Sequence, residues 1–404
     1  EPLNPFDRSL ESLLHGGSHL KANLVLSVLS GVLFSFAIPA GAQTQSAPAP
    51  ASPPAAPPTW SVGSLDFSGL IDGYYSYNAN RPSNAANGQI NDLYNFNDKT
   101  DQFNLSAAKF TVGYDPNPIG FRLDLLFGRA KTFLHSSDKG TDNYIEQAYI
   151  SAKPPKWHGT EVDFGQFVTS AGAEVIEAKD DWNYSRSILF AWAIPYYHFG
   201  LRAAVPVTAS WTAGVQVVNG WNNVVDNNGG ATIGLTSALT RPKYAWALNY
   251  YTGPENTDTQ KSYRNLIDTT VMLTPVSKFS AYINYDYGQN HSPAAIAGGV
   301  PVPEQSPHWQ GVAFAAHGQI MSKSALAGRV EYFDDHQGFS TGSAQAVKEF
   351  TGTYEYKWLS GLLTRVEYRR DWSNVDFFHK GDGGMVDAQS TLTMAFIAFF
   401  SPKR

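Results

Sequence analysis

The chain contains no cysteine and relatively few charged residues. The absence of Cys among its 404 residues excludes disulfides and thiolate metal sites. Charged side chains make up 16% of the chain, below the roughly 25% of an average soluble domain. The net charge of -6 argues against nucleic acid as a partner, because phosphate binding needs clustered Lys and Arg. Aromatic residues reach 14%, which fits strands with one oily and one polar face.

Motifs of enzymes and metal sites are also missing. No His-Glu-x-x-His occurs, the ten His residues are scattered, and no Gly-rich phosphate loop precedes a helix. The stretch Gly338–Gly342 matches G-x-S-x-G, but it lies in a short polar loop rather than between a strand and a helix. We therefore expect no catalytic residues, no metal ligands and no cofactor.

The N-terminal region has the features of an exported protein. Lys21 precedes an apolar run of about 15 residues that ends at Ala40-Gly41-Ala42, which is typical of a secretory signal. A spanning helix would need roughly 20 apolar residues. We assign residues 1–42 to an N-terminal extension and signal peptide, and residues 43–63 to a disordered Ala/Pro-rich linker. The folded part is expected over 64–401, with 402–404 as a short tail.

Most of the remaining chain alternates between polar and apolar residues. In "RVEYRRDW", Arg365, Glu367, Arg369 and Asp371 share one face of an extended strand, and Val366 and Tyr368 lie on the other. The same split occurs in sixteen segments: 65–75, 107–114, 120–128, 145–153, 160–167, 196–205, 209–219, 231–239, 243–252, 264–274, 278–288, 309–321, 325–334, 347–358, 362–372 and 388–400. Soluble strands average about 5–6 residues, whereas 9–11 tilted residues cross a bilayer.

The connections between these segments alternate in length. Seven short turns, such as 115–118 and 153–156, alternate with eight longer polar connections, such as 79–102 and 289–307. This predicts an all-β fold: a transmembrane antiparallel up-and-down β-barrel of about 16 strands, with long external loops and short periplasmic turns. A soluble sheet whose charged face meets solvent is the alternative, but aromatic residues near the ends of long strands favour the membrane.

Three segments resemble a known family. Residues Phe67–Pro82, Asn117–Gly128 and Gly172–Ala203 are similar to the OmpL-like β-barrel porin family of Gram-negative bacteria, over about 64–401. The C-terminal strand, which ends in aromatic residues at 399–400, resembles the signal that the outer-membrane assembly machinery reads. The resemblance implies an outer-membrane porin without catalytic residues or cofactor.

The alternation predicts which charged residues line the lumen. The expected lining residues are Asp72, Lys109, Arg122, Asp124, Asp163, Arg202, Asp268, Asp286, Arg329, Glu331, Arg365, Glu367, Arg369 and Asp371. Over all strands, twelve acidic and seven basic residues fall on this face, so we expect weak cation selectivity.

The third long connection, residues 168–195, is the candidate constriction. Its charged residues are Glu174, Glu177, Lys179, Asp180, Asp181 and Arg186, a mixed set that can orient polar solutes in a channel. The alternative is an exposed loop kept in solution by its charges. The apolar run Ile188–Ile194 is unusual for a solvated loop and favours inward folding or a subunit contact.

These observations together predict a porin in the cell outer membrane that forms a water-filled channel for passive diffusion of small hydrophilic solutes. A structural or adhesive barrel with a plugged lumen, or an outer-membrane enzyme, would be the alternatives. The expected partners are outer-membrane lipid and lipopolysaccharide, the assembly machinery, the solutes themselves and other copies of the chain in a homotrimer.

Overall fold

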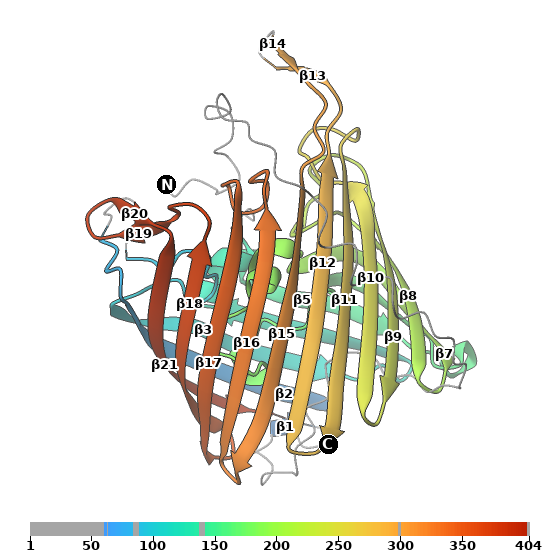
Figure 1. Cartoon of the computed structure of the whole chain (residues 1–404). Helices are drawn as coiled ribbons and strands as arrows, with labels where there is room; N and C mark the ends of the chain where they lie inside the picture. Colours follow the sequence, from blue (N-terminus) through green and yellow to red (C-terminus); the bar gives the residue numbers. More distant parts are fainter. Residues whose placement is uncertain (1–59, 63, 84–88, 137–141, 298–299, 402–404) are drawn as a thin grey trace.

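The computed structural model describes residues 60–62, 64–83, 89–136, 142–297 and 300–401, which form a β-barrel (Figure 1). The predicted signal peptide and most of the predicted linker lie outside the described residues. Among those described, no helix is long and apolar enough to span a membrane.

Sixteen long strands make up the barrel, as the sequence predicts. They are β2 (Leu65–Asn78), β3 (Gln102–Tyr114), β4 (Ile119–Phe127), β5 (Ile145–Ala152), β6 (Glu161–Val168), β7 (Tyr197–Thr208), β8 (Trp211–Val218), β9 (Thr232–Arg241), β10 (Tyr244–Pro254), β11 (Tyr263–Val276), β12 (Phe279–His291), β15 (His308–Met321), β16 (Ser324–Asp335), β17 (Gln345–Leu359), β18 (Leu362–Ser373) and β21 (Ala388–Phe400). Each pairs antiparallel with the next, and β2 pairs with both β3 and β21, so the sheet has no open edge.

Shorter elements complete the described chain. They are β1 (Trp60–Val62), α1 (Arg129–Leu134), η2 (Asp142–Tyr144), η3 (Pro155–Trp157), η4 (Ala178–Asp180), η5 (Leu189–Ala193), β13 (Ala295–Ala297), β14 (Val300–Val302), β19 (Phe378–Lys380) and β20 (Gly384–Val386). The β13–β14 hairpin projects beyond the rim in Figure 1.

A strand lies ahead of the expected barrel boundary at residue 64. Strand β1 pairs with β2, with Trp60 opposite Phe67, so the last residues of the predicted 43–63 linker belong to the sheet. Strand β3 also begins at Gln102, before the predicted 107. A β-bulge lies opposite Asp72 and Gly73 and interrupts the two-residue period, so alternation fails as a signal there.

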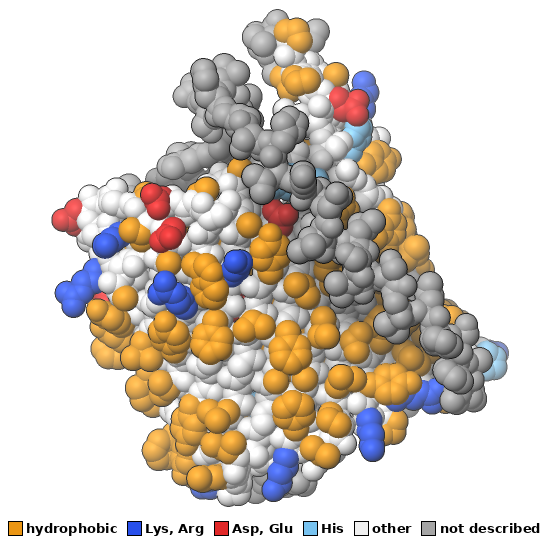
Figure 2. All heavy atoms as spheres, in the orientation of Figure 1, with side chains coloured by type: hydrophobic (Ala, Val, Ile, Leu, Met, Phe, Trp, Pro, Cys, Tyr) orange, Lys and Arg blue, Asp and Glu red, His pale blue; other side chains and the backbone are white. Residues whose placement is uncertain are grey.

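The strand faces separate as the alternation predicts. In β18, Arg365 and Glu367 are each 2% exposed, whereas Val366 and Tyr368 on the opposite face are each 42% exposed. Apolar side chains form a broad band on the outer wall in Figure 2. This arrangement places the ionised residues inside the barrel and the apolar residues against lipid.

The two sides of the barrel differ in height. Strands β4, β5 and β6 have nine, eight and eight residues, whereas β15, β16, β17 and β18 have between 12 and 15. The short and long walls lie on opposite sides of the closed ring, because β5 and β15 are half the ring apart.

Candidate functional site

Charged residues on the inner faces of the strands are mostly buried. Of the fourteen predicted lining residues, twelve are buried, and only Arg122 and Arg202 are partly exposed. Many of the buried residues contact a chain segment that lies inside the barrel rather than open space.

That segment is the long connection between β6 and β7, residues 168–195, which we term the inner loop. Near its start, the Gly172 N–H donates to Asp268 of β11 at 3.0 Å. Further along, the Asn183 side chain donates to Thr353 of β17 at 2.8 Å, and near its end the Trp309 indole of β15 donates to the Ala193 carbonyl at 3.0 Å. The inner loop therefore contacts three strands that are not adjacent in the ring, β11, β15 and β17.

An ion-pair cluster ties Glu174 of the inner loop to β16 and β17. The Arg329 guanidinium lies 2.6 Å from the Glu174 carboxylate, 3.0 Å from Glu331 and 3.3 Å from Glu349. Burial favours a raised pKa for Glu174, but the charge of Arg329 and the Ser187 N–H outweigh it and hold that pKa below its usual range. Glu174 thus stays ionised and fixed to the wall.

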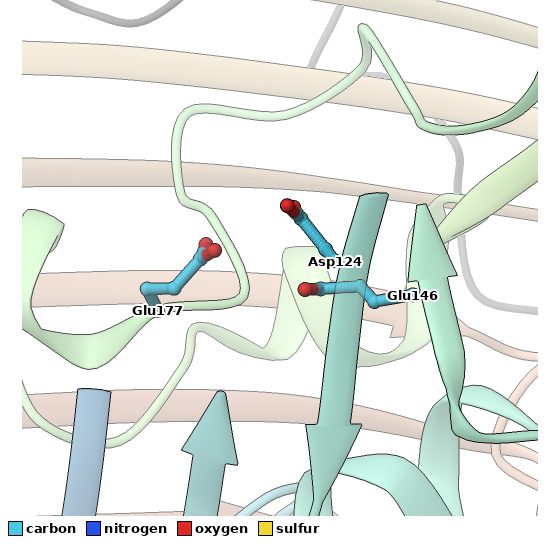
Figure 3. Close-up of side chains that lie close together, drawn as sticks. All are labelled: Asp124, Glu146 and Glu177. Carbon is cyan, nitrogen blue, oxygen red and sulfur yellow. The ribbon is translucent and has the colours of Figure 1, made fainter. Parts of the chain in front are cut away.

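A second cluster involves Glu177 and the wall formed by β3, β4 and β5. Asp124, Glu146 and Glu177 bring carboxylate oxygens within 4.8 Å of one another, in the arrangement shown in Figure 3. Three such carboxylates would suit a hard cation. The Lys109 ammonium already lies among them, 2.9 Å from Asp124, 2.5 Å from Glu146 and in contact with Glu177. The cluster thus joins the inner loop to the wall through a protein cation.

Other wall carboxylates accept hydrogen bonds from the backbone of the inner loop. Glu367 accepts from the N–H groups of Tyr184 and Ser185, at 2.5 and 2.9 Å. Glu331 accepts from the N–H groups of Ile188 and Leu189, at 3.0 and 3.2 Å. These contacts satisfy backbone donors that lie outside any strand and would otherwise be unpaired inside the barrel.

Basic wall residues satisfy the carbonyl groups of the inner loop in the same way. Arg365 donates to the carbonyls of Ala178, Asp181 and Asn183 while it pairs with Glu355 at 2.7 Å. The Arg369 guanidinium donates to the Arg186 carbonyl at 2.7 Å. The ladder in "RVEYRRDW" is therefore a set of anchors for the inner loop.

The remaining ionisable side chains of the inner loop contact one another. The Arg186 Nε lies 2.9 Å from the Asp181 carboxylate, but its N–H donates to the Val175 carbonyl at 2.8 Å. Burial raises the pKa of Asp181 to about 8. Lys179 pairs with Asp180, whose side chain is 52% exposed.

The apolar end of the inner loop packs against the long wall. Leu189, in η5, lies over Gly311 of β15, where an added Cβ would come within 2.7 Å of the Leu189 side chain. The side chains of Ile188, Leu189 and Phe190 are at most 3% exposed. The stretch 174–182 contains one 3-10 turn, η4.

A second internal segment was missed by sequence reasoning. Residues 89–101, in the connection expected to be an external loop, lie inside the barrel, with Tyr94 and Phe96 at 4% and 1% exposure. The Tyr94 hydroxyl contacts Thr391 at 2.6 Å, and the Trp192 indole of the inner loop donates to the Leu93 carbonyl at 3.0 Å. Three large apolar residues, Leu93, Tyr94 and Phe96, were the available signal.

Two histidines on the inner faces of the strands pack against aromatic rings. His198 is fully buried, contacts the Gly220 carbonyl through Nδ1 at 3.0 Å and stacks on Tyr251. His317 stacks on Trp182 of the inner loop, with ring centroids 5.7 Å apart. Both rings serve packing.

A closed barrel with a loop held across its interior is the architecture of outer-membrane porins. The family model described as "Putative beta-barrel porin-2, OmpL-like" matches residues 64–400, so the chain belongs to this family of outer-membrane porins. A search of curated proteins finds no match.

Solved structures of bacterial outer-membrane proteins share the fold. OmpT of Vibrio cholerae is 12% identical with a TM-score of 0.55, covering 85% of this chain and 100% of that chain. The channel DcaP of Acinetobacter baumannii is 12% identical with a TM-score of 0.55, covering 83% and 97%. An anion-selective porin from Comamonas acidovorans is 11% identical with a TM-score of 0.54, covering 83% and 99%.

Proposed function

We propose that this porin is a diffusion channel for small hydrophilic solutes, with the inner loop as its constriction and a weak preference for cations. The observation that carries the proposal is the fixed course of the inner loop across the interior. Its polar side chains and backbone N–H groups are hydrogen-bonded to β2, β11, β16, β17 and β18. Solutes therefore have only the space that this loop does not fill. A constriction fixed in this way limits solute size without any moving part.

The preference for cations is proposed from the charge surplus on the wall. The inner faces of the strands carry twelve acidic and seven basic residues. Ion pairs neutralise most of these charges, but an excess of negative charge remains on the wall. Salt screens charges over about 10 Å at 0.1 M, so the preference in a wide channel is weak.

The experiment is conductance of the purified, folded full-length chain in a planar lipid bilayer. Steady open-channel steps support the proposal. A barrel with a plugged lumen is the second candidate, because residues 89–101 occupy the interior together with the inner loop. Folded protein without conductance would favour that plugged barrel and contradict the diffusion channel.

We also infer that the chain forms a homotrimer whose subunits contact one another through the short wall, strands β4 to β6. OmpT of Vibrio cholerae, in a structure described as its trimer form, shares this fold with a TM-score of 0.54 at 12% identity over 83% of this chain and 99% of that chain. In this chain, β5 and β6 have eight residues, fewer than the nine to eleven that cross a bilayer, and expose Ile150 and Phe164 at 58% and 54%. A partner subunit would cover these residues. The mass of the native protein tests the inference, and a trimer should have three times the mass of one chain.

A further inference from the structure

The outer surface of the long wall contains an apolar groove. Its cavity volume is about 570 Å³, and its lining includes Phe279, Gly318, Gly328, Gly352, Tyr354 and Leu392. The groove crosses the strands from β12 to β21, on the face where the side chains of alternate residues point to lipid.

The groove exists because small residues are in register on adjacent strands. Ala316 of β15 pairs with Gly328 of β16, which pairs with Gly352 of β17. The neighbouring outward positions are large: Val330 and Phe350 on one side of the row, and Leu326 and Tyr354 on the other. With strands about 4.8 Å apart, this row of three small residues spans roughly 10 Å.

The barrel itself does not require these glycines. An added Cβ at Gly318 meets nothing within 4 Å, and at Gly328 and Gly352 it meets only ordinary contacts of 3.8–3.9 Å. None of the three has a positive φ. Glycine weakens a strand, and its presence in a strand interior often marks the close approach of another group.

Two cations lie beside the outer end of the groove. Arg370 on β18 pairs with Phe350, one row above Gly352, and Lys348 on β17 lies four residues, roughly 13 Å, from Gly352. Both side chains are exposed and point outward. Neither forms an ion pair within the part of the chain that the structure describes; Arg370 donates to the Ser390 hydroxyl at 3.0 Å. Figure 2 shows basic side chains beside the apolar band on this face.

The height of this wall identifies what covers the groove. Strands β15 to β18 have 12–15 residues, which is enough to cross the bilayer. This wall therefore faces lipid. The short wall on the opposite side is the one that needs a subunit contact. Lys348 and Arg370 lie toward the end of the barrel that carries the long loops, at the outer leaflet. An acyl chain fits the apolar groove, and a phosphate fits the two cations.

We propose that the wall formed by β15–β18 binds a phosphorylated glycolipid of the outer leaflet. Lys348 and Arg370 hold its phosphate groups, and one acyl chain occupies the groove over Gly328 and Gly352. The site is independent of whether the barrel conducts.

The first test removes the charge. The purified full-length barrel in detergent is titrated with diphosphoryl lipid A, with dephosphorylated lipid A and with phosphatidylethanolamine, and bound lipid is counted by native mass spectrometry. The double variant K348Q/R370Q should bind diphosphoryl lipid A about thirtyfold more weakly, since each cation near the membrane surface contributes about a fivefold factor. Lys278→Gln, an exposed cation in a short turn, is the matched control and should bind normally.

The second test fills the groove. Gly352→Leu places an apolar side chain in space that the wall leaves open and should weaken binding of diphosphoryl lipid A several-fold. Ala213→Leu, which creates the same side chain on the outer face of β8, should not weaken it. The proposal would be overturned if all variants bound diphosphoryl lipid A equally. It would also be overturned if the wild-type chain bound dephosphorylated lipid A and phosphatidylethanolamine as tightly as diphosphoryl lipid A. Loss of an oligomer in Gly352→Leu alone would instead assign the groove to a second copy of the chain.

Discussion

Arg329 of β16 and Glu174 of the inner loop form a fully internal ion pair of 2.6 Å, with side chains 0% and 4% exposed. The pair joins a barrel strand to a loop residue 155 positions away in the sequence. A charge left unpaired in such surroundings is expensive, so the pair fixes the loop position more than it adds stability.

Glu174→Gln should loosen the inner loop without unfolding the barrel. Arg329 retains Glu331 and Glu349 as partners, so we expect a loss of about 1–3 kcal/mol, the usual effect of removing a charged hydrogen-bond partner. The midpoint of heat-induced unfolding should fall, and single-channel current noise should rise. Glu304→Gln, with its side chain 66% exposed, is the control. Identical noise in both variants would show that Glu174 does not fix the loop.

Deletion of residues 173–181 should raise single-channel conductance while the barrel still assembles. The wall cations that lose loop partners keep their own: Lys109 keeps Asp124 and Glu146, and Arg365 keeps Glu355. Each of these wall cations therefore keeps an ion-pair partner after the deletion. Folding is checked by resistance of the barrel to heat in detergent. A folded deletion variant with unchanged conductance would place the conduction path away from the inner loop.

The barrel could be predicted from sequence because bilayer and lumen impose opposite requirements on alternate residues. Val366 is 42% exposed on the outer face, whereas the adjacent Arg365 is 2% exposed on the inner face. The course of the inner loop could be predicted only as far as its apolar end, Ile188–Ile194. Its contacts depend on which residues face one another across the ring, and no local pattern encodes that the Glu367 carboxylate meets the Tyr184 and Ser185 amides. The inward course of 89–101 was missed because the polar residues around Leu93, Tyr94 and Phe96 are also typical of an external loop.

The pH dependence of stability should include a contribution from Asp181. Burial raises its folded-state pKa to about 8 from an ordinary value of 3.8, so between these values the folded chain holds a proton that the unfolded chain has lost. Stability from this residue is thus present below about pH 4 and is lost as pH rises to about 8. Asp181→Asn should gain stability relative to wild type from pH 5 to pH 8.

The measurement is the heat-unfolding midpoint at pH 5, 6.5 and 8. Asp180→Asn changes the adjacent, half-exposed carboxylate and should keep the wild-type profile. A constant difference between Asp181→Asn and wild type at all three pH values would contradict a raised pKa.

Surface proteolysis should report the orientation of the barrel. A lysine-specific protease added to intact cells should cut after Lys261 and Lys380, which are exposed in long connections, and should spare Lys156 and Lys278 in short turns. The segment 89–101 should resist, because it lies inside the barrel and its one lysine, Lys99, is only partly exposed. Permeabilising the outer membrane should give the protease access to Lys156 and Lys278. Cuts at Lys156 or Lys278 in intact cells would reverse the topology.

Ion selectivity should be weakly cationic and sensitive to Arg122. Most wall cations are neutralised by internal pairs, but the Arg122 side chain is 38% exposed while it pairs with Asp124 at 3.0 Å. Arg122→Gln should increase the preference for K⁺ over Cl⁻, since Asp124 keeps Lys109 and the interior loses one exposed positive charge. Arg370→Gln, on the outer wall, should leave it unchanged.

The reversal potential in a KCl gradient measures the preference, which should shrink as salt rises because the screening length falls from about 10 Å at 0.1 M to about 3 Å at 1 M. A reversal potential with the sign of anion selectivity at low salt would contradict the prediction. It would mean that exposed cations such as Arg122 and Arg202 influence permeating ions more than the excess of carboxylates does. Selectivity that is strong and independent of salt would instead indicate a path narrower than a wide, screened channel.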